Sequence, residues 1–473
     1  MKPFVLSFLF AFGVQVASLV AQIVPVTVTV TDSGRGADLS AHFMGLSYET
    51  SMLLPKDGRY YFNPNDEALI NTFRTLGIKS LRIGGNSVDD SRVAIPQEKD
   101  IDVLFRFARA AGVKVIYSFR LKRGNPADSA RLARYIVANY ADALDCFAIG
   151  NEPNVYLPTY EAYLPQWKLQ YHAILQAVPQ ATFDGPSVNG RNNYALNLAR
   201  DMFPAGHLAM ASEHYYFMGS GEEGERDPEG TRDKFLSNNT HWDYQQAYDR
   251  VGGVLAREHV PYRIDELNSC FNGGAKGSSD TYASTLWALD CTHWWAARPI
   301  LGLNYHTTER PVGGGDFTAA NYASFVHTPG GGGLTMRPLA YAYLAFSQGA
   351  RGRPLGVKRV PGPEFNFDAY AYRDDDGSIY LTLINKTYGT QAHATAISIQ
   401  LPSGTNWGAW RRMDLLGRQN IAGKSGMTLG GGSIDQQGQW AGQWKTIEGN
   451  FSSNMTIQLS PASATILNIE AAP

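Results

Sequence analysis

Cysteine is scarce in this sequence. The chain has 473 residues and only three cysteines, Cys146, Cys270 and Cys291. Their spacing matches no metal-binding motif, so we expect no metal site, and three cysteines are too few for a disulfide framework. One bridge between Cys270 and Cys291 and a set of free buried thiols are both compatible with the sequence.

A strong charge of one sign is also absent. The chain has 41 Lys and Arg against 43 Asp and Glu, a formal net charge of −2. This balance gives no basic surface for a polyanion, which argues against nucleic acid or a highly sulphated polymer as the main partner. The glycine runs 313–315 and 330–333 are not followed by Gly-Lys-Ser/Thr, so they predict no phosphate-binding loop. We expect no cofactor.

Long apolar runs are limited to the N-terminus. Met1 and Lys2 precede an apolar run from Phe4 to Val20. Small residues, including Ala17, Ser18 and Ala21, lie at the end of this run. This pattern predicts a signal peptide over residues 1–21. A membrane anchor is the weaker interpretation, because a span needs about 20 apolar residues. We expect an exported protein, secreted or periplasmic, that does not associate with the membrane after signal removal.

A pattern that the sequence does contain is a repeated alternation of strand and helix. Short β-rich runs end in polar or glycine residues, and a helical stretch follows each. Eight such units predict a (β/α)₈ TIM barrel of the α/β class over residues 41–350, closed by a helical segment at 337–348. The eight runs are residues 43–49, 80–85, 113–119, 146–152, 181–187, 208–216, 261–267 and 300–306.

Two segments depart from this alternation. The acidic, glycine-rich residues 217–235 follow the sixth run and are expected to form a loop over the barrel mouth, although a solvated charged face would give the same pattern. From residue 351 to 473 the pattern becomes that of an all-β sandwich domain, with a hairpin at Asp376-Gly377. Residues 22–40 also alternate and are expected to add an N-terminal strand to that domain.

Two carboxylates stand where barrel strands are predicted to end. Glu152 ends the fourth run in Gly150-Asn151-Glu152-Pro153, and Glu266 ends the seventh. TIM-barrel active sites lie at the C-terminal ends of the strands, so these side chains should face each other across the barrel mouth. A lone glutamate would be a solvated surface residue, but such a pair is what glycoside hydrolysis requires. Asn151 would then donate a hydrogen bond to the sugar 2-hydroxyl.

The chain resembles the retaining barrel glycosidases of clan A, and within them glycoside hydrolase family 79, the β-glucuronidases and heparanases. It is most similar to the bacterial exo-acting β-glucuronidases of that family. The resemblance spans the barrel and, by architecture, the terminal β-domain. It rests on Leu81 to Asn86 (LRIGGN), Phe147 to Pro153 (FAIGNEP), Glu213 to Tyr216 (EHYY) and Glu266 with Asn272 to Gly274 (NGG).

The resemblance implies a role for each matching residue. Glu152 would be the acid/base and Glu266 the nucleophile. Substrate-binding roles would fall to Glu49, Asn86, His214 and Tyr216, with a tyrosine near the eighth strand on the sugar carboxylate, assigned to Tyr305 although Tyr322 competes. Two residues have alternative roles. Arg82 would contact the sugar or would form an ion pair with Glu49 or Glu266. His214 would contact the sugar or would only support a strand.

The segment after the predicted nucleophile suits a carboxylate ligand. Gly273 and Gly274 lack side chains, so their N–H groups can approach an anion closely, and Lys276 adds a positive charge. The alternative is that these glycines only turn the chain. We therefore expect a retaining exo-β-glucuronidase acting on a glucuronic-acid-containing glycan or glycoconjugate.

Three rival functions share parts of this pattern. A β-glucosidase or β-xylosidase of the same clan would keep both glutamates. An endo-acting heparanase would need a basic cleft, which the near-neutral charge does not favour. A carbohydrate-binding protein on an inactive barrel would have lost Glu152, Glu266 or Asn151, and all three are present. The aglycone and the oligomeric state are left open.

Overall fold

The computed structural model describes residues 23–33, 38–309, 319–328, 332–362, 365–418, 420–453 and 455–472. The predicted signal peptide and the glycine run 313–315 lie outside these residues. A search of the described helices finds none with the length and apolar character that a membrane span requires.

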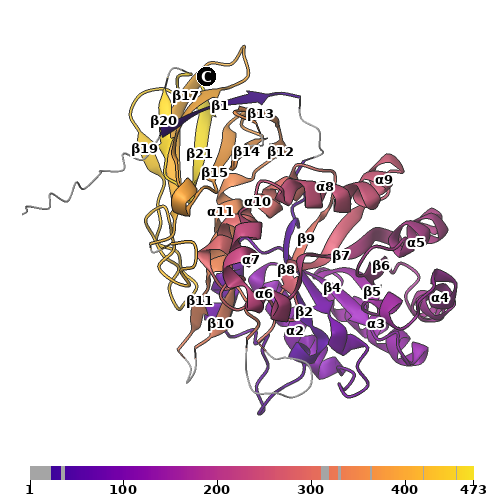
Figure 1. Ribbon diagram of the computed structural model, residues 1–473. Coiled ribbons are helices and arrows are strands. Elements are labelled where there is room, and N and C mark those ends of the chain that lie inside the picture. Colours follow the sequence, from indigo (N-terminus) through magenta and orange to yellow (C-terminus); the bar gives the residue numbers. More distant parts are fainter. Residues whose placement is uncertain are drawn as a thin grey trace, which may run out of the picture.

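Eight parallel strands close into a barrel in the order of the sequence, as predicted (Figure 1). Each predicted run overlaps one of them, and most of their side chains are buried because helices cover the outside of the barrel and side chains fill the inside. The strands are β2 (Met44–Glu49), β3 (Ser80–Gly84), β4 (Lys114–Phe119), β5 (Leu144–Ile149), β6 (Phe183–Val188), β7 (Leu208–Ser220), β8 (Tyr262–Phe271) and β9 (Gly302–His306).

Local sequence explains where the outer helices begin and end. Asn125 caps α3 by accepting the Ala127 N–H at 3.1 Å, with Pro126 at the first helical position. Gly112 ends α2 with a left-handed φ of 75°. The covering helices are α1 (Glu67–Thr75), α2 (Glu98–Ala111), α3 (Pro126–Tyr140), α4 (Tyr160–Ala177), α5 (Tyr194–Met202), α8 (Thr240–Arg250), α9 (Gly252–Arg257), α10 (Tyr282–Ala296) and α11 (Pro338–Gly349).

Short 3₁₀ turns follow several strands and helices. They are η1 (Thr50–Leu53), η2 (Asn86–Val88), η3 (Pro153–Val155), η4 (Phe203–Ala205) and η5 (Gly389–Gln391). Three of them, η1, η2 and η3, come directly after β2, β3 and β5, so they shape the rim of the barrel mouth.

The insertion after the sixth barrel strand is helical, which corrects the prediction of a loop over residues 217–235. β7 continues to Ser220, and α6 (Gly221–Arg226) and α7 (Pro228–Phe235) follow. Ser220 accepts the Glu223 N–H at 3.2 Å and Asp227 accepts the Gly230 N–H at 2.9 Å, so each helix has an N-cap. These caps outweigh the glycines that suggested a loop.

The β-domain packs two sheets around its own core. One sheet has the order β13-β1-β16-β20 and the other β12-β14-β15-β21-β17-β18, with β19 paired to β17. Buried Val28, Ile397, Leu381, Leu467 and Trp410 belong to the core between them. The strands are β1 (Ile23–Thr31), β12 (Arg353–Pro354), β13 (Gly356–Val360), β14 (Phe367–Arg373), β15 (Ile379–Asn385), β16 (Ala394–Gln400), β17 (Trp407–Leu416), β18 (Thr428–Leu429), β19 (Lys445–Ile447), β20 (Thr456–Leu459) and β21 (Ser463–Ala471).

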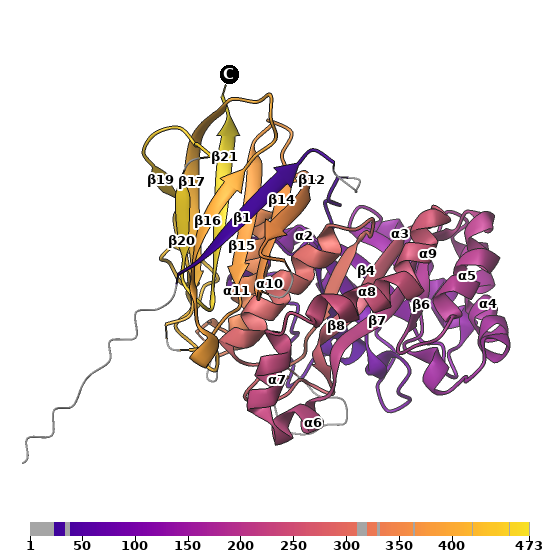
Figure 2. The same ribbon diagram turned by 45° about the horizontal axis from the view of Figure 1, so that its top comes forward.

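The first strand belongs to this β-domain although it precedes the barrel. β1 pairs antiparallel with β13 and parallel with β16 (Figure 2). The Asp376-Gly377 hairpin joins β14 to β15, with Gly377 at a φ of 85°. A small separate sheet pairs β10 (Phe325–His327) with β11 (Leu334–Met336). The predicted fold class, a TIM barrel with a β-sandwich, is confirmed.

The helices α10 and α11 lie between the barrel and the β-domain (Figure 1). Every residue of α10 is buried, because one face packs on the barrel and another on β14. Cys291 lies on this helix, and all three cysteines are free and buried. The barrel and the sandwich are therefore held together by a continuous interior.

Candidate active site

The strand ends bring most of the predicted site residues to one cavity of about 1760 Å³ at the barrel mouth. Its wall includes Glu49, Asn86, Glu152, His214, Tyr216, Glu266, Gly273, Gly274 and Lys276. Asn151 lies directly beneath this wall, where it is buried.

The Glu266 carboxylate, on β8, is held by several cationic and polar groups. Its Oε2 accepts a hydrogen bond from Arg82 at 2.6 Å, and its Oε1 accepts one from the Tyr216 hydroxyl at 2.8 Å. His306 Nδ1 lies 3.6 Å from Oε2. Burial alone would raise the pKa of Glu266, but the charges of His306, His214 and Arg82 lower it well below its ordinary value. This carboxylate is therefore ionised at neutral pH.

Glu152 follows β5 in a strained backbone conformation. Its φ of 46° lies in the left-handed region, which non-glycine residues rarely adopt. The Glu152 N–H donates to the Ser187 carbonyl at 2.8 Å, which fixes this conformation. Its Oε1 contacts His214, while its Oε2 has no hydrogen bond from the described residues. One oxygen of Glu152 is thus available to a ligand in the cavity.

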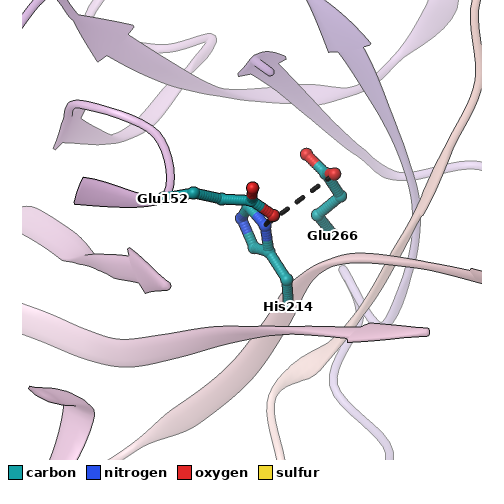
Figure 3. Close-up of side chains that lie close together, drawn as sticks. All are labelled: Glu152, His214 and Glu266. Atoms are coloured by element: carbon teal, nitrogen blue, oxygen red, sulfur yellow. Dashed lines mark hydrogen bonds and ion pairs between the residues drawn. The ribbon is translucent and has the colours of Figure 1, made fainter. Parts of the chain in front are cut away.

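His214, on β7, lies between the two glutamates (Figure 3). Its Nδ1 is 2.8 Å from Glu152 Oε1 and 3.8 Å from Glu266 Oε1. Burial opposes a charge on the ring, but the carboxylates of Glu266, Glu152 and Asp265 raise the pKa of His214 to about 9. The ring is therefore protonated at neutral pH.

The two glutamates lie close together across the barrel. One ligand atom each of Glu152, His214 and Glu266 lies within 4.8 Å of the other two, so this distance also joins a carboxylate oxygen of Glu152 to one of Glu266. The three groups have the spacing of metal ligands, but Arg82 and the protonated His214 already supply positive charge. A second group of this spacing, His241, Asp290 and Asp368, has the Lys386 ammonium 3.1 Å from Asp290 and 2.8 Å from Asp368. Neither group favours a further cation.

Arg82, on β3, is hydrogen-bonded to side chains from three other barrel segments. It is fully buried and donates to Ser47 Oγ at 3.0 Å and to Asn151 Oδ1 at 2.7 Å, besides Glu266. Of the two partners proposed from the sequence, Arg82 pairs with Glu266 and not with Glu49. A Cβ at Gly84 would lie 2.8 Å from the Arg82 guanidinium carbon, so this position requires glycine.

Glu49 and Asn86 line the cavity at the ends of β2 and β3, on the β9 side of the predicted nucleophile. Glu49 accepts the N–H groups of Asn86 at 3.2 Å and Ser87 at 2.7 Å, and burial raises its pKa. Gly85 has a φ of 65°, and a Cβ there would lie 2.5 Å from the Glu49 carboxylate. The Asn86 side chain accepts a hydrogen bond from Asn151 Nδ2 at 3.1 Å. Asn151 is thus engaged with Arg82 and Asn86.

The structure contradicts the assignment of Tyr305 to the sugar carboxylate. Tyr305 is fully buried, and its hydroxyl lies 2.8 Å from Thr292 Oγ1 on α10, outside the barrel. The competing Tyr322 lines the cavity, as do Tyr216 and Gly273. Successive side chains of a strand point to opposite faces, so His306, next to Tyr305, points inward.

The turn after β8 holds the Tyr322 segment in place. The Asn321 N–H donates to the Gly273 carbonyl at 2.6 Å. Gly273 and Gly274 have left-handed φ values of 86° and 80°. A Cβ at Gly274 would lie 2.9 Å from the Tyr322 ring, so both glycines turn the chain and Gly274 also admits the tyrosine. Lys276 lies on the rim, exposed.

His306 is the site residue that the sequence did not reveal. It lies 3.7 Å from Glu49 and 3.6 Å from Glu266 and so links the two carboxylates. Its position at the end of the eighth strand was a usable signal, because the alternation there makes either Tyr305 or His306 face the barrel interior.

Comparisons with known proteins agree with this arrangement. No protein-family model matches the chain. A β-glucuronidase from Aspergillus niger is 24% identical over 225 residues, which are 41% of this chain and 41% of that relative. The match therefore spans less than half of either protein, and it confirms the resemblance to β-glucuronidases stated from the motifs.

Solved structures resemble the chain over nearly its whole length. A 4-O-α-L-rhamnosyl-β-D-glucuronidase from Fusarium oxysporum has a TM-score of 0.68 at 18% identity, covering 93% of this chain and 99% of that one. A family 51 arabinofuranosidase from Xanthomonas axonopodis pv. citri has a TM-score of 0.65 at 14% identity, covering 94% and 100%. The chain is thus similar in fold to barrel glycosidases and, over part of its length, in sequence to a β-glucuronidase.

Proposed function

We propose that this protein is a retaining exo-β-glucuronidase that hydrolyses terminal β-linked glucuronic acid. The observation that carries the proposal is a pair of glutamates, Glu152 just after β5 and Glu266 within β8, whose oxygens lie within 4.8 Å of each other in unlike surroundings. Retaining glycosidases separate their carboxyl groups by about 5 to 5.5 Å, whereas inverting enzymes need about 6.5 to 9.5 Å to admit a water.

The surroundings assign one role to each glutamate. Glu266 is held ionised by Arg82 and Tyr216, as a nucleophile that attacks the anomeric carbon must be. Glu152 has one oxygen turned to the cavity and acts as the acid that protonates the leaving oxygen. The same residue then removes a proton from the water that opens the glycosyl-enzyme. His214 donates to Glu152 and keeps its carboxyl group directed toward Glu266.

Several donors meet where a sugar carboxylate would lie. Tyr322, Tyr216 and Gly273 line the cavity, with the Asn321 N–H holding the Tyr322 segment on the Gly273 carbonyl, and Lys276 adds positive charge at the rim. A buried carboxylate needs such donors to offset the cost of losing its water. Glu49 and Asn86, which line the same cavity, are placed to hold the sugar hydroxyls. Asn151 acts mainly by holding Asn86 and Arg82 in position.

The rim carries charges of both signs and is not the basic cleft that cleavage within a sulphated chain would need, which favours exo action. Glu222 and Glu225 of α6 line the cavity and would repel sulphate groups. The N-terminal apolar run supports export, so we propose a secreted or periplasmic enzyme acting on a glucuronic-acid-containing glycan or glycoconjugate.

One experiment tests both the sugar and the stereochemistry. Wild-type protein is given p-nitrophenyl β-glucuronide and p-nitrophenyl β-glucoside, kcat/KM is measured for each, and the first-formed product anomer is identified by proton NMR. We expect β-glucuronic acid first and a preference for the glucuronide on the order of a hundredfold, the worth of about two charge-assisted hydrogen bonds. Equal rates on both sugars would refute the glucuronidase assignment, and an α-anomer formed first would refute retention.

A further inference from the structure

The cavity continues beyond the residues that hold the terminal sugar. On the side of Glu152 its wall is formed by the segment after β6 and by one face of α8, namely Asn189, Gly190, Arg191, Trp242, Asp243 and Gln246. Trp242 and Gln246 are four residues apart on the helix and therefore lie on the same face. Trp242 is 63% exposed, unusual for a tryptophan, and none of the roles proposed above uses it.

Hydrogen bonds join this wall to the acid/base. Asn154, two residues after Glu152, donates from Nδ2 to Asn189 Oδ1 at 2.9 Å. Asn192 Nδ2 in turn donates to the Asn189 carbonyl at 2.6 Å, and Arg250 of α8 donates to the Asn192 carbonyl at 3.1 Å. The turn after Glu152, the segment after β6 and the end of α8 therefore form one connected unit.

This unit lies where the leaving group must go. Glu152 protonates the glycosidic oxygen, so the group attached to that oxygen leaves on the Glu152 side of the cavity. We propose, on the basis of the function proposed above, that Trp242 and Arg191 form an aglycone subsite whose occupant is a neutral sugar ring. The natural substrate is then a β-glucuronosyl saccharide.

The chemistry of the subsite favours a sugar over an apolar aglycone. An exposed indole ring offers a flat face to the C–H groups of a sugar ring. Around it stand hydrogen-bonding side chains, since Asp243 and Gln246 are on the same helix and Arg191 is close enough for its charge to oppose the rise that burial gives the pKa of Asp243. Arg191 makes no ion pair or hydrogen bond with the described residues, which leaves its guanidinium available to hydroxyl groups.

The test separates the two subsites by using substrates that differ only in the leaving group. β-Glucuronosyl fluoride occupies the terminal-sugar site alone, whereas a disaccharide of β-linked glucuronic acid and glucose, which has a neutral second ring, also requires the aglycone site. We expect Trp242→Ala to lower kcat/KM on the disaccharide about tenfold, the upper range for one aromatic stacking contact, and to leave the fluoride unchanged. Trp242→Phe should recover most of the loss.

A matched control removes another exposed apolar side chain. Leu169 on α4 is also 63% exposed and does not line the cavity, so Leu169→Ala should affect neither substrate. The aglycone proposal is overturned if wild-type protein cleaves the fluoride but not the disaccharide, or if Trp242→Ala affects both substrates equally or neither. Failure of wild-type protein on the fluoride would instead overturn the proposed glucuronidase function.

Discussion

Two buried charge clusters in this protein are built from the same kinds of residue but have opposite access to ligands. The site cluster contains Glu152, His214 and Glu266, and the interdomain cluster contains His241, Asp290 and Asp368, each with ligand atoms within 4.8 Å of one another. The glutamate side chains of the site cluster are 16% and 8% exposed and face the cavity. The aspartates of the interdomain cluster are 0% and 5% exposed and do not line that cavity, and only its His241 reaches the surface, at 28% exposed.

The interdomain cluster is balanced by its own cations. Lys386, which follows β15, contacts Asp290 on α10 and Asp368 on β14, and Tyr370 donates to Asp290 at 2.6 Å. Burial would lower the pKa of Lys386, but the two aspartates raise it, so the ammonium stays charged. The cluster thus joins the barrel helix α10 to the sandwich.

The difference between the clusters lies in which polar atoms are satisfied. Both oxygens of Asp290 accept hydrogen bonds, from His241, Tyr370 and Lys386. In the site cluster Glu152 keeps one oxygen turned to the cavity and without a hydrogen bond from the described residues. A buried carboxylate with every partner in place holds a structure together, whereas one with an open position can exchange a proton with a ligand.

The largest effect should come from removing the charge of the nucleophile. Glu266→Gln keeps the side-chain shape but cannot form the glycosyl-enzyme, so we expect a loss greater than the ~10²–10⁴-fold that a general acid/base contributes. The loss should appear in kcat/KM on every glucuronide, including those with good leaving groups. Glu222→Gln, which changes another carboxylate lining the cavity, is the control and should keep wild-type activity. Near-wild-type turnover of Glu266→Gln would disprove the assignment.

A smaller and more selective effect is expected at the acid/base. Glu152→Ala should slow hydrolysis of unactivated glucuronides by roughly 10²–10⁴-fold, while an activated aryl glucuronide still forms the covalent intermediate. Added azide should then restore turnover and give a β-glucuronosyl azide, measured by aryl release and NMR. An α-azide, or no rescue at any azide concentration, would count against this role.

The interdomain cluster should respond in stability and not in activity. Lys386→Met leaves two buried aspartates without their ammonium partner, which costs about 3–5 kcal/mol of unfolding free energy when a buried pair is broken. Urea unfolding measures the loss, and kcat/KM of the folded variant should equal that of wild type. Arg131→Met breaks the exposed pair with Glu98 and should cost no more than about 1 kcal/mol. If Lys386→Met were as stable as Arg131→Met, the interdomain cluster would not hold the domains together.

The success of the sequence predictions differed between the barrel and the parts that cover it. The apolar runs and their order along the chain were enough to predict the barrel, because buried parallel strands are apolar and end in polar residues. The prediction of a loop at 217–235 was wrong. Its glycines suggested a loop more strongly than the N-cap residues Ser220 and Asp227 suggested the two helices. Among the site residues, Glu152 and Glu266 were predicted from the ends of the apolar runs and both line the cavity, although β8 continues past Glu266 to Phe271, whereas Tyr305 was assigned to the wrong face of its strand.

The sequence by itself thus determined the barrel, the β-domain and the two strand ends where Glu152 and Glu266 lie, because these follow from local periodicity and chain order. Only the tertiary structure decided which side chains share the cavity. It turned His306 inward in place of Tyr305, brought the Tyr322 segment to Gly273 across 49 residues of chain, and placed Trp242 and Arg191 on the wall of one cavity. The β8–β9 register shifts between Ile264 and Leu267, and the paths of the connecting segments depend on packing against distant helices. No local pattern encodes either feature, since both arise from contacts between residues far apart in the chain.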